Sequence, residues 1–181
     1  TTGYRGFYYH FLDPSTGLRF RKVELSTIDT ALMMAGVLFC REYYDQDTEL
    51  ERRIRELSEF LYRRVEWDWA QVRGGLISHG WKPESGMLKH DYKGYNEAML
   101  LYILALGSPT HPAREDSWES FISSCNVTDF YGQPHVNFTP LFGHQYSHVW
   151  VDFRGIQDAF IKEQGIDYFE NSRRATYSQR S

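Results

Sequence analysis

Cysteine is scarce in this chain, since only Cys40 and Cys125 occur among its 181 residues. Two cysteines are too few for a disulfide framework, and Cys40 lies in an apolar helical stretch where it can fill the core. Long apolar runs are also missing. The longest run, Ala98 to Leu106, is far shorter than the roughly 20 residues that a membrane span needs. We therefore expect no membrane partner.

The chain has no excess of basic charge. Its 20 Lys and Arg residues stand against 24 Asp and Glu residues, a net charge of −4. Proteins that bind nucleic acid usually carry a basic excess. The one arginine-rich cluster, at residues 52–64, alternates with glutamates, which is typical of a solvated helix face. We expect no nucleic-acid partner.

Motifs for metal and cofactor chemistry are absent as well. No HExxH, CxxC, GxGxxG, GxxxxGK[ST] or GxSxG pattern occurs, so we expect no cofactor, no metal site and no serine nucleophile. His144 and His148 have a spacing that could bind metal on a helix. Because Gly143 and several aromatic residues surround them, we interpret them as loop histidines that hydrogen-bond substrate or backbone.

Aromatic residues are abundant: 13 Tyr, 12 Phe and 5 Trp. Tyr and Trp combine a large apolar face with a polar group, which suits a concave site for sugar rings. The same composition also fits an aromatic-rich core, and the count alone does not separate the two interpretations.

The apolar spacing predicts mainly helices. A buried helix begins after Ser26, an amphipathic helix follows Thr48, and a second buried helix runs from about Tyr95 to Leu106. Shorter helices are expected at about 114–124, 156–164 and 168–180, with a hairpin near 7–20, a short hairpin or ordered loop at 74–92, and a long loop at 126–150. We predict an all-α fold: one domain over residues 1–181, built as an array of αα-hairpins with small β-hairpins.

Acidic residues at the starts of the two buried helices are candidates for chemistry. Cleavage of a glycosidic bond usually needs one carboxylic acid to protonate the leaving oxygen and a second carboxylate as base or nucleophile. Asp29 and Glu97 occupy the expected first turns, which would place them on one rim; Glu24 and Asp91 are further candidates. The alternative for Glu97 is that it only complements the helix dipole.

Several segments together resemble the bacterial glycoamylase-like family, which is related to endo-β-1,2-glucanases and to the glucan-acting domain of cyclic β-1,2-glucan synthases. They cover nearly the whole chain in order. The segments are Val23–Leu32, Gly80–Pro83, Gly94–Tyr102, Leu106–Pro112, Pro140–His148 with Trp150–Arg154, and Tyr168–Thr176.

The resemblance implies part of an (α/α)6 barrel and a glycoside hydrolase or transglycosylase that acts on β-linked glucan, with β-1,2-glucan expected. It makes Glu97 the general acid and lets Asp29 position the sugar or a water. It also implies a periplasmic or secreted location. The substrate-binding residues that it implies are Glu24, Trp81, Tyr95, His144, Gln145, Tyr146, His148 and Arg154.

The family's domain extends past the segment that ends at Thr176, so the resemblance implies a chain truncated at its C-terminus. A second catalytic carboxylate is expected beyond residue 181. A partial barrel exposes an apolar flank, which predicts self-association. Two other functions remain open: a carbohydrate-binding module without turnover, and an α-helical interaction scaffold.

Overall fold

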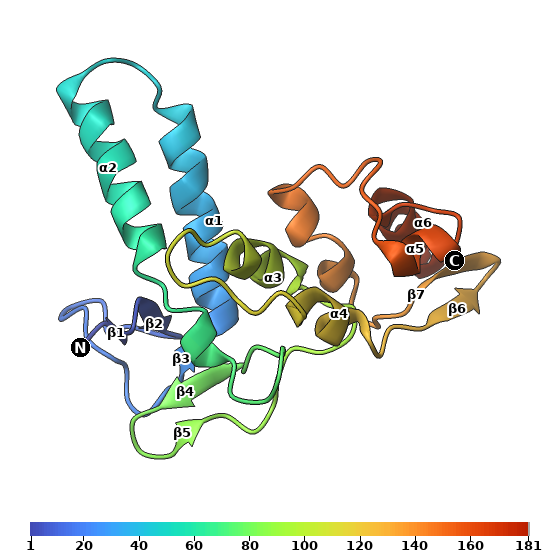
Figure 1. Cartoon of the computed structure of the whole chain (residues 1–181), viewed down its shortest axis with the longest axis horizontal. Coiled ribbons are helices and arrows are strands. Elements are labelled where there is room, and N and C mark those ends of the chain that lie inside the picture. The colour runs from blue at the N-terminus through green and yellow to red at the C-terminus, as the bar shows by residue number, and fades with distance from the viewer. Residues whose placement is uncertain (181) are drawn as a thin grey trace. The chain divides into compact units, whose positions relative to one another are not determined.

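The computed structural model describes residues 1–180 and divides into two compact units. Unit 1 comprises residues 1–92 and 101–117, and unit 2 comprises residues 93–100 and the chain from Trp118 onward. The helix α3 (Met99–Leu106) contributes residues to both units. Figure 1 shows the elements in chain order.

Unit 1 contains a sheet and a helical hairpin. Its elements are β1 (Gly3–Tyr4), β2 (Phe7–Tyr9), β3 (Leu25–Ser26), α1 (Thr27–Tyr43), α2 (Glu49–Arg63), the 3₁₀ turn η1 (Asp68–Ala70), β4 (Gly80–Lys82) and β5 (Gly86–Met87). Unit 2 holds shorter elements. They are α4 (Ser117–Ile122), which begins at the boundary, β6 (Val127–Phe130), β7 (Gln133–Val136), the 3₁₀ turns η2 (Leu141–His144) and η3 (Ser147–Val149), α5 (Ala159–Glu163) and α6 (Tyr168–Arg180).

The prediction of an all-α fold was wrong. Of the structure, 41% is helix and 14% is strand, and the strands of unit 1 form one five-stranded antiparallel sheet within the described residues, in the order β1-β2-β3-β4-β5. The strands are two or three residues long, too short to show an alternating apolar pattern. The pairing of Leu25 with Trp81 and of Ser26 with Gly80 is also long-range, so no local pattern signals it.

A side-chain cap marks the start of each helix in the α1–α2 hairpin. The Ser26 hydroxyl accepts a hydrogen bond from the Asp29 N–H at 3.2 Å, and the Thr48 hydroxyl accepts one from the Glu51 N–H at 3.2 Å. Each cap satisfies a backbone donor that has no partner inside its helix. Both predicted helix starts are confirmed.

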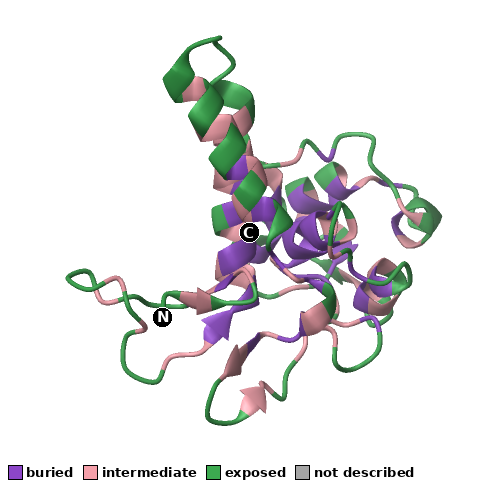
Figure 2. Ribbon diagram, turned by 60° about the vertical axis from the view of Figure 1, so that its left-hand side comes forward, coloured by how far each residue is buried: buried purple, intermediate pink, exposed green. Residues whose placement is uncertain are grey.

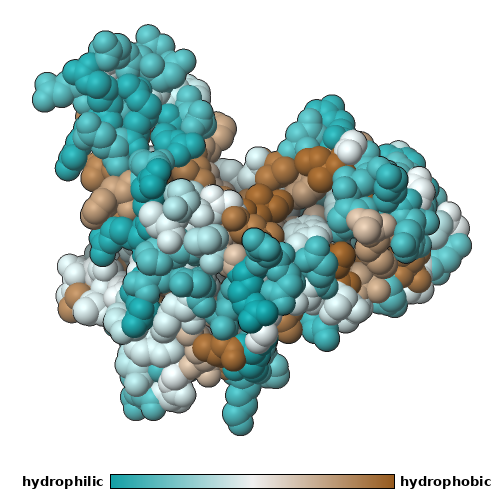
Figure 3. Space-filling view, viewed as in Figure 1, coloured by the Kyte–Doolittle hydropathy of each residue, from teal (hydrophilic) through white to brown (hydrophobic). Residues whose placement is uncertain are grey.

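The expectation that α1 is buried on all sides was wrong. Its buried residues lie between Thr27 and Ala35, whereas Met33 and Phe39 are 38% and 59% exposed. Figure 2 shows the outer turns of the α1–α2 hairpin as exposed, and Figure 3 shows hydrophilic atoms over its end. The apolar pattern therefore predicts the helix correctly but not its burial.

Other predicted elements also differ from the structure in their bounds. Phe7–Tyr9 pairs with β1 and β3, so the predicted hairpin at 7–20 is reduced to a loop closed by one bridge between Leu12 and Arg19. The predicted loop at 126–150 contains the β6–β7 hairpin. Its two turn residues, Tyr131 and Gly132, both have positive φ, as a type I′ turn requires. A tyrosine in that conformation is uncommon, which hid the hairpin from the sequence.

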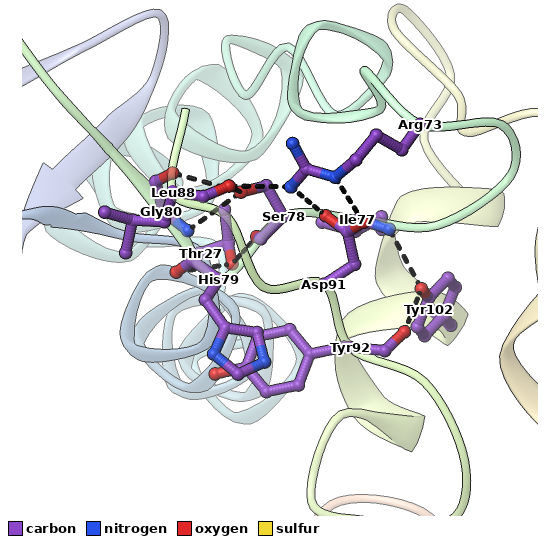
Figure 4. A network of polar contacts seen from close by, with 10 residues as sticks. All are labelled: Thr27, Arg73, Ile77, Ser78, His79, Gly80, Leu88, Asp91, Tyr92 and Tyr102. Carbon is purple, nitrogen blue, oxygen red and sulfur yellow. Dashed lines mark hydrogen bonds and ion pairs between the residues drawn. The ribbon is translucent and has the colours of Figure 1, made fainter. Parts of the chain in front are cut away.

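A polar network fixes the loop that carries β4 and β5 within unit 1 (Figure 4). Arg73 Nε lies 2.6 Å from Asp91 Oδ2, and the Thr27 hydroxyl donates to the Ser78 carbonyl at 2.7 Å. The Tyr102 hydroxyl accepts from the Ile77 N–H at 2.9 Å. The Asp91 carboxylate, a sequence candidate for chemistry, is thus held in a structural ion pair.

Candidate functional site

The predicted site residues fall into two sets, one in each unit. Unit 1 holds Glu24, Asp29 and Trp81, and unit 2 holds the others. The prediction that the carboxylates of Asp29 and Glu97 share one face stays a prediction.

The set in unit 1 is built where β3 runs into α1. Glu24 directly precedes β3, and Asp29 lies in the first turn of α1. Their side chains are 27% and 45% exposed. Burial raises the pKa of the Glu24 carboxyl, but the hydrogen bond with His10 and the charges of His10 and Lys82 outweigh it, so that pKa lies below its usual value. Glu24 therefore carries a negative charge at neutral pH.

A histidine that the sequence analysis missed belongs to this set. His10 Nδ1 lies 2.7 Å from Glu24 Oε1, and His10 Nε2 lies 3.6 Å from Asp29 Oδ2. No motif marks His10, because it reaches both carboxylates only through the pairing of β2 with β3.

An aromatic cluster in unit 1 surrounds Trp81 of β4. Trp81 on β4 pairs with Leu25, the neighbour of Glu24. The Tyr4 ring stacks on Trp81 at 5.0 Å between centroids and 23° between planes, and the Trp69 ring meets it edge-on at 5.8 Å. Gly80 is required here, because a Cβ on it would stand 2.1 Å from the Leu25 carbonyl oxygen.

Glu97 lies outside the helix in which it was predicted. Helix α3 begins at Met99, so the predicted start at Tyr95 was wrong. The Asn96 side-chain oxygen accepts from the Ala98 N–H at 2.8 Å, and the Ser147 hydroxyl donates to the Glu97 carbonyl at 3.2 Å. These bonds hold the segment as a turn, and no acidic residue occupies the first turn of α3. An interaction with the dipole of α3 therefore explains the position of Glu97 poorly.

The Glu97 carboxyl is half-buried in unit 2. Its Oε2 atom is closed off from solvent and has no hydrogen-bond partner among the described residues. An enclosed polar oxygen without a partner is costly and calls for an explanation. A ligand that supplies the missing hydrogen bond is one such explanation.

The two predicted histidines have different surroundings. His144 is 1% exposed, its Nε2 lies 2.9 Å from the Phe138 carbonyl oxygen, and its ring packs on Tyr95 at 4.8 Å. Burial lowers the pKa of His144 to about 4 and raises that of the Tyr95 hydroxyl. His148 packs on Phe153 at 4.6 Å, and burial also lowers its pKa. Both imidazoles are therefore neutral near pH 7.

A hollow of about 320 Å³ contains two of the predicted residues. Its wall is formed by His148, the segment Val149–Arg154 and Phe169. Trp150 is 38% exposed and Phe169 is 44% exposed. Arg154 forms an ion pair with Asp152 at 2.6 Å, and this pair holds the pKa of Asp152 at about 2. Aromatic surface can stack on a sugar ring, and charged groups can bond its hydroxyls, so the hollow suits a sugar ligand.

Gln145 and Tyr146 complete the predicted set. Both are exposed, and the Tyr146 ring meets Phe142 at 5.1 Å. The structure brings neither residue into the hollow beside Arg154.

Residues 1–180, the described part of the chain, lack two features. No group of three or more His, Cys, Asp or Glu side chains in this part of the chain is arranged to hold a metal ion. None of the helices described is both long and apolar enough to cross a membrane.

Partly exposed carboxylates and partly exposed aromatic rings are both kinds of group that a carbohydrate-active site uses. Residues 89–181 match the model of the glycoamylase family, whose description reads "Putative glucoamylase". The match covers half of the chain, and the chain belongs to this family.

Individual proteins agree with this assignment. The chain is 26% identical over 208 aligned residues to an exo β-1,2-glucooligosaccharide sophorohydrolase (non-reducing end) of Parabacteroides distasonis, with 94% of this chain and 28% of that protein covered. It is also similar to the crystal structures of two proteins that carry the family's description, "putative glucoamylase". One is from Bacteroides uniformis (28% identity, TM-score 0.88) and the other from Bacteroides fragilis (26% identity, TM-score 0.87).

Those structures align with 98% and 97% of this chain, which spans 45% and 44% of their own length. The chain therefore spans less than half the length of the proteins that it matches.

Proposed function

We propose that this chain carries part of the active site of a glycoside hydrolase that cleaves β-1,2-linked glucooligosaccharides. Family membership and the similarity to a sophorohydrolase support the reaction class and the linkage. The observation that carries the proposal is the enclosed, unpartnered oxygen of Glu97.

Glu97 acts as the general acid in this proposal. The carboxylic acid protonates the glycosidic oxygen as the bond to the anomeric carbon breaks. The carboxyl is only half-buried, and its Oε2 atom has no hydrogen-bond partner among the described residues, so its hydrogen-bonding capacity is left for the substrate. Asp29, whose carboxylate accepts a hydrogen bond from the Ser26 hydroxyl, positions the sugar or a water.

Replacing Glu97 tests the assignment. In the whole protein, Glu97→Gln keeps the shape of the side chain but removes its acidic proton. We expect the release of sugar from a β-1,2-linked glucooligosaccharide to fall by roughly 10²- to 10⁴-fold. Glu119→Gln is the matched control, because Glu119 is exposed on α4. Unchanged turnover in Glu97→Gln would overturn the acid assignment.

A carbohydrate-binding module without turnover is the second candidate. The hollow beside Trp150 and Phe169 supports it, because that hollow offers aromatic surface without Glu97. Binding of a β-1,2-linked glucooligosaccharide by the whole protein without any product would favour this candidate over the hydrolase. Absence of binding to every glucan tested would favour the interaction scaffold.

We also propose that the chain self-associates when isolated. Exposed apolar side chains on the α1–α2 hairpin support this. They are Met33, Phe39, Leu57 and Phe60. A single monomeric species in sedimentation velocity at rising concentration would contradict it. The periplasmic or secreted location stays a prediction from the resemblance.

A further inference from the structure

The placement of His10 is set by the sheet of unit 1. His10 directly follows β2, and Glu24 directly precedes β3, its antiparallel neighbour. The His10 N–H donates to the Glu24 carbonyl oxygen at 2.9 Å. Helix α1 follows β3 without a break, so Asp29 stands one helical turn beyond the same strand. Two strands and a helix start therefore bring three functional side chains together.

A single imidazole lies between the two carboxylates, within hydrogen-bond distance of Glu24 and within ion-pair distance of Asp29. Nδ1 lies 2.7 Å from Glu24 Oε1, while Nε2 lies 3.6 Å from Asp29 Oδ2. The ring stacks on Phe11 at 4.2 Å between centroids and 13° between planes. The same oxygen, Asp29 Oδ2, also accepts a hydrogen bond from the Ser26 hydroxyl.

Stability alone is a poor reason for this arrangement. The side chains of His10, Glu24 and Asp29 are 38%, 27% and 45% exposed. Polar contacts this exposed contribute little to folding, and two neighbouring carboxylates repel one another. What the bridge does supply is orientation, because it limits the rotation of two acidic side chains that a ligand can still reach.

We propose that His10 is a positioning residue that holds the carboxylates of Glu24 and Asp29 in the orientation in which they meet the sugar. This inference rests on the proposed function, since it assigns these carboxylates to the substrate. His10 does not exchange a proton with the substrate; it acts through the two acids. Its loss therefore lowers turnover by releasing them.

Two conservative variants separate the two halves of the bridge. The amide nitrogen of Asn can take the place of Nδ1, so His10→Asn keeps the contact with Glu24. The longer Gln can reach the place of Nε2, so His10→Gln keeps the contact with Asp29. His10→Ala removes both contacts. His111→Ala is the control, because His111 Nδ1 stands 3.7 Å from the carboxylate of Asp68, outside the site.

The first readout is the ¹³C NMR shift of the two side-chain carboxyls, which needs no substrate. We expect both resonances to move in His10→Ala and neither to move in the control. In His10→Asn the Asp29 resonance moves more than that of Glu24, and in His10→Gln the order reverses. An Asp29 resonance that stays in place in His10→Ala overturns the bridge.

The second readout is hydrolysis of a β-1,2-linked glucotetraose by the whole protein. We expect kcat of His10→Ala to fall at least tenfold with a smaller change in KM, and His10→Asn to recover part of the loss. Wild-type kcat in His10→Ala, with the carboxyl shifts moved as expected, overturns the positioning role. If the wild-type protein releases no sugar, the proposed function fails, while the carboxyl shifts still decide the bridge.

Discussion

Ser147→Ala should weaken the fold and displace Glu97 at the same time. The Ser147 hydroxyl is 1% exposed, accepts from the Leu100 N–H at 3.1 Å and donates to the Glu97 carbonyl at 3.2 Å. Leu100 is the second residue of α3, so its N–H has no partner inside the helix. Ser147 therefore caps a helix from a distant part of the chain.

The magnitude follows from these two bonds. Loss of a capping hydroxyl costs about 0.5–2 kcal/mol, and loss of a hydrogen bond to a buried carbonyl costs about 1 kcal/mol. We expect the free energy of unfolding to fall by about 2 kcal/mol. With a urea dependence of about 2 kcal/mol per molar, the midpoint drops by about 1 M.

Urea unfolding followed by tryptophan fluorescence measures this effect. Ser123→Ala is the control, because its exposed hydroxyl bonds only to the Ser120 carbonyl, and such a change stays within about 0.5 kcal/mol. Turnover by Ser147→Ala should also fall, since the Glu97 backbone loses its tether. A midpoint equal to that of the control would refute the capping role.

Three further perturbations have defined outcomes. Gly80→Ala forces a Cβ against the Leu25 carbonyl oxygen, so thermal unfolding should show a loss of roughly 1–3 kcal/mol. Burial lowers the pKa of His144 to about 4. Between about pH 6.5 and pH 4, His144 is therefore protonated in the unfolded chain but neutral in the folded chain. Stability is therefore intact above about pH 6.5 and falls by up to about 3 kcal/mol towards pH 4; His144→Gln should flatten that slope in urea titrations. Trp150→Ala removes aromatic surface from the hollow, and calorimetry should show about tenfold weaker glucooligosaccharide binding; unchanged affinity would exclude the hollow as a sugar site.

Local signals account for much of what the sequence determined. Ser26 and Thr48 bond to backbone groups three residues away, so the starts of α1 and α2 could be read directly. The predicted helix at 168–180 is confirmed as α6. The segments that carry the family resemblance were also visible in the sequence alone, and the family match over residues 89–181 confirms the family.

Long-range pairing decided the rest. The sheet depends on the pairing of Leu25 with Trp81, and the ion pair of Asp91 depends on Arg73. Neither contact produces a periodic pattern in the sequence. The placement of His10 arises in the same way, because its carboxylate partners lie directly before a neighbouring strand and on the helix that follows that strand. The sequence by itself determined which residues can act as acids and where the main helices begin. Only the tertiary structure decided which acids are occupied by structural partners, because hydrogen bonds between distant segments depend on the pairing of strands and not on local spacing.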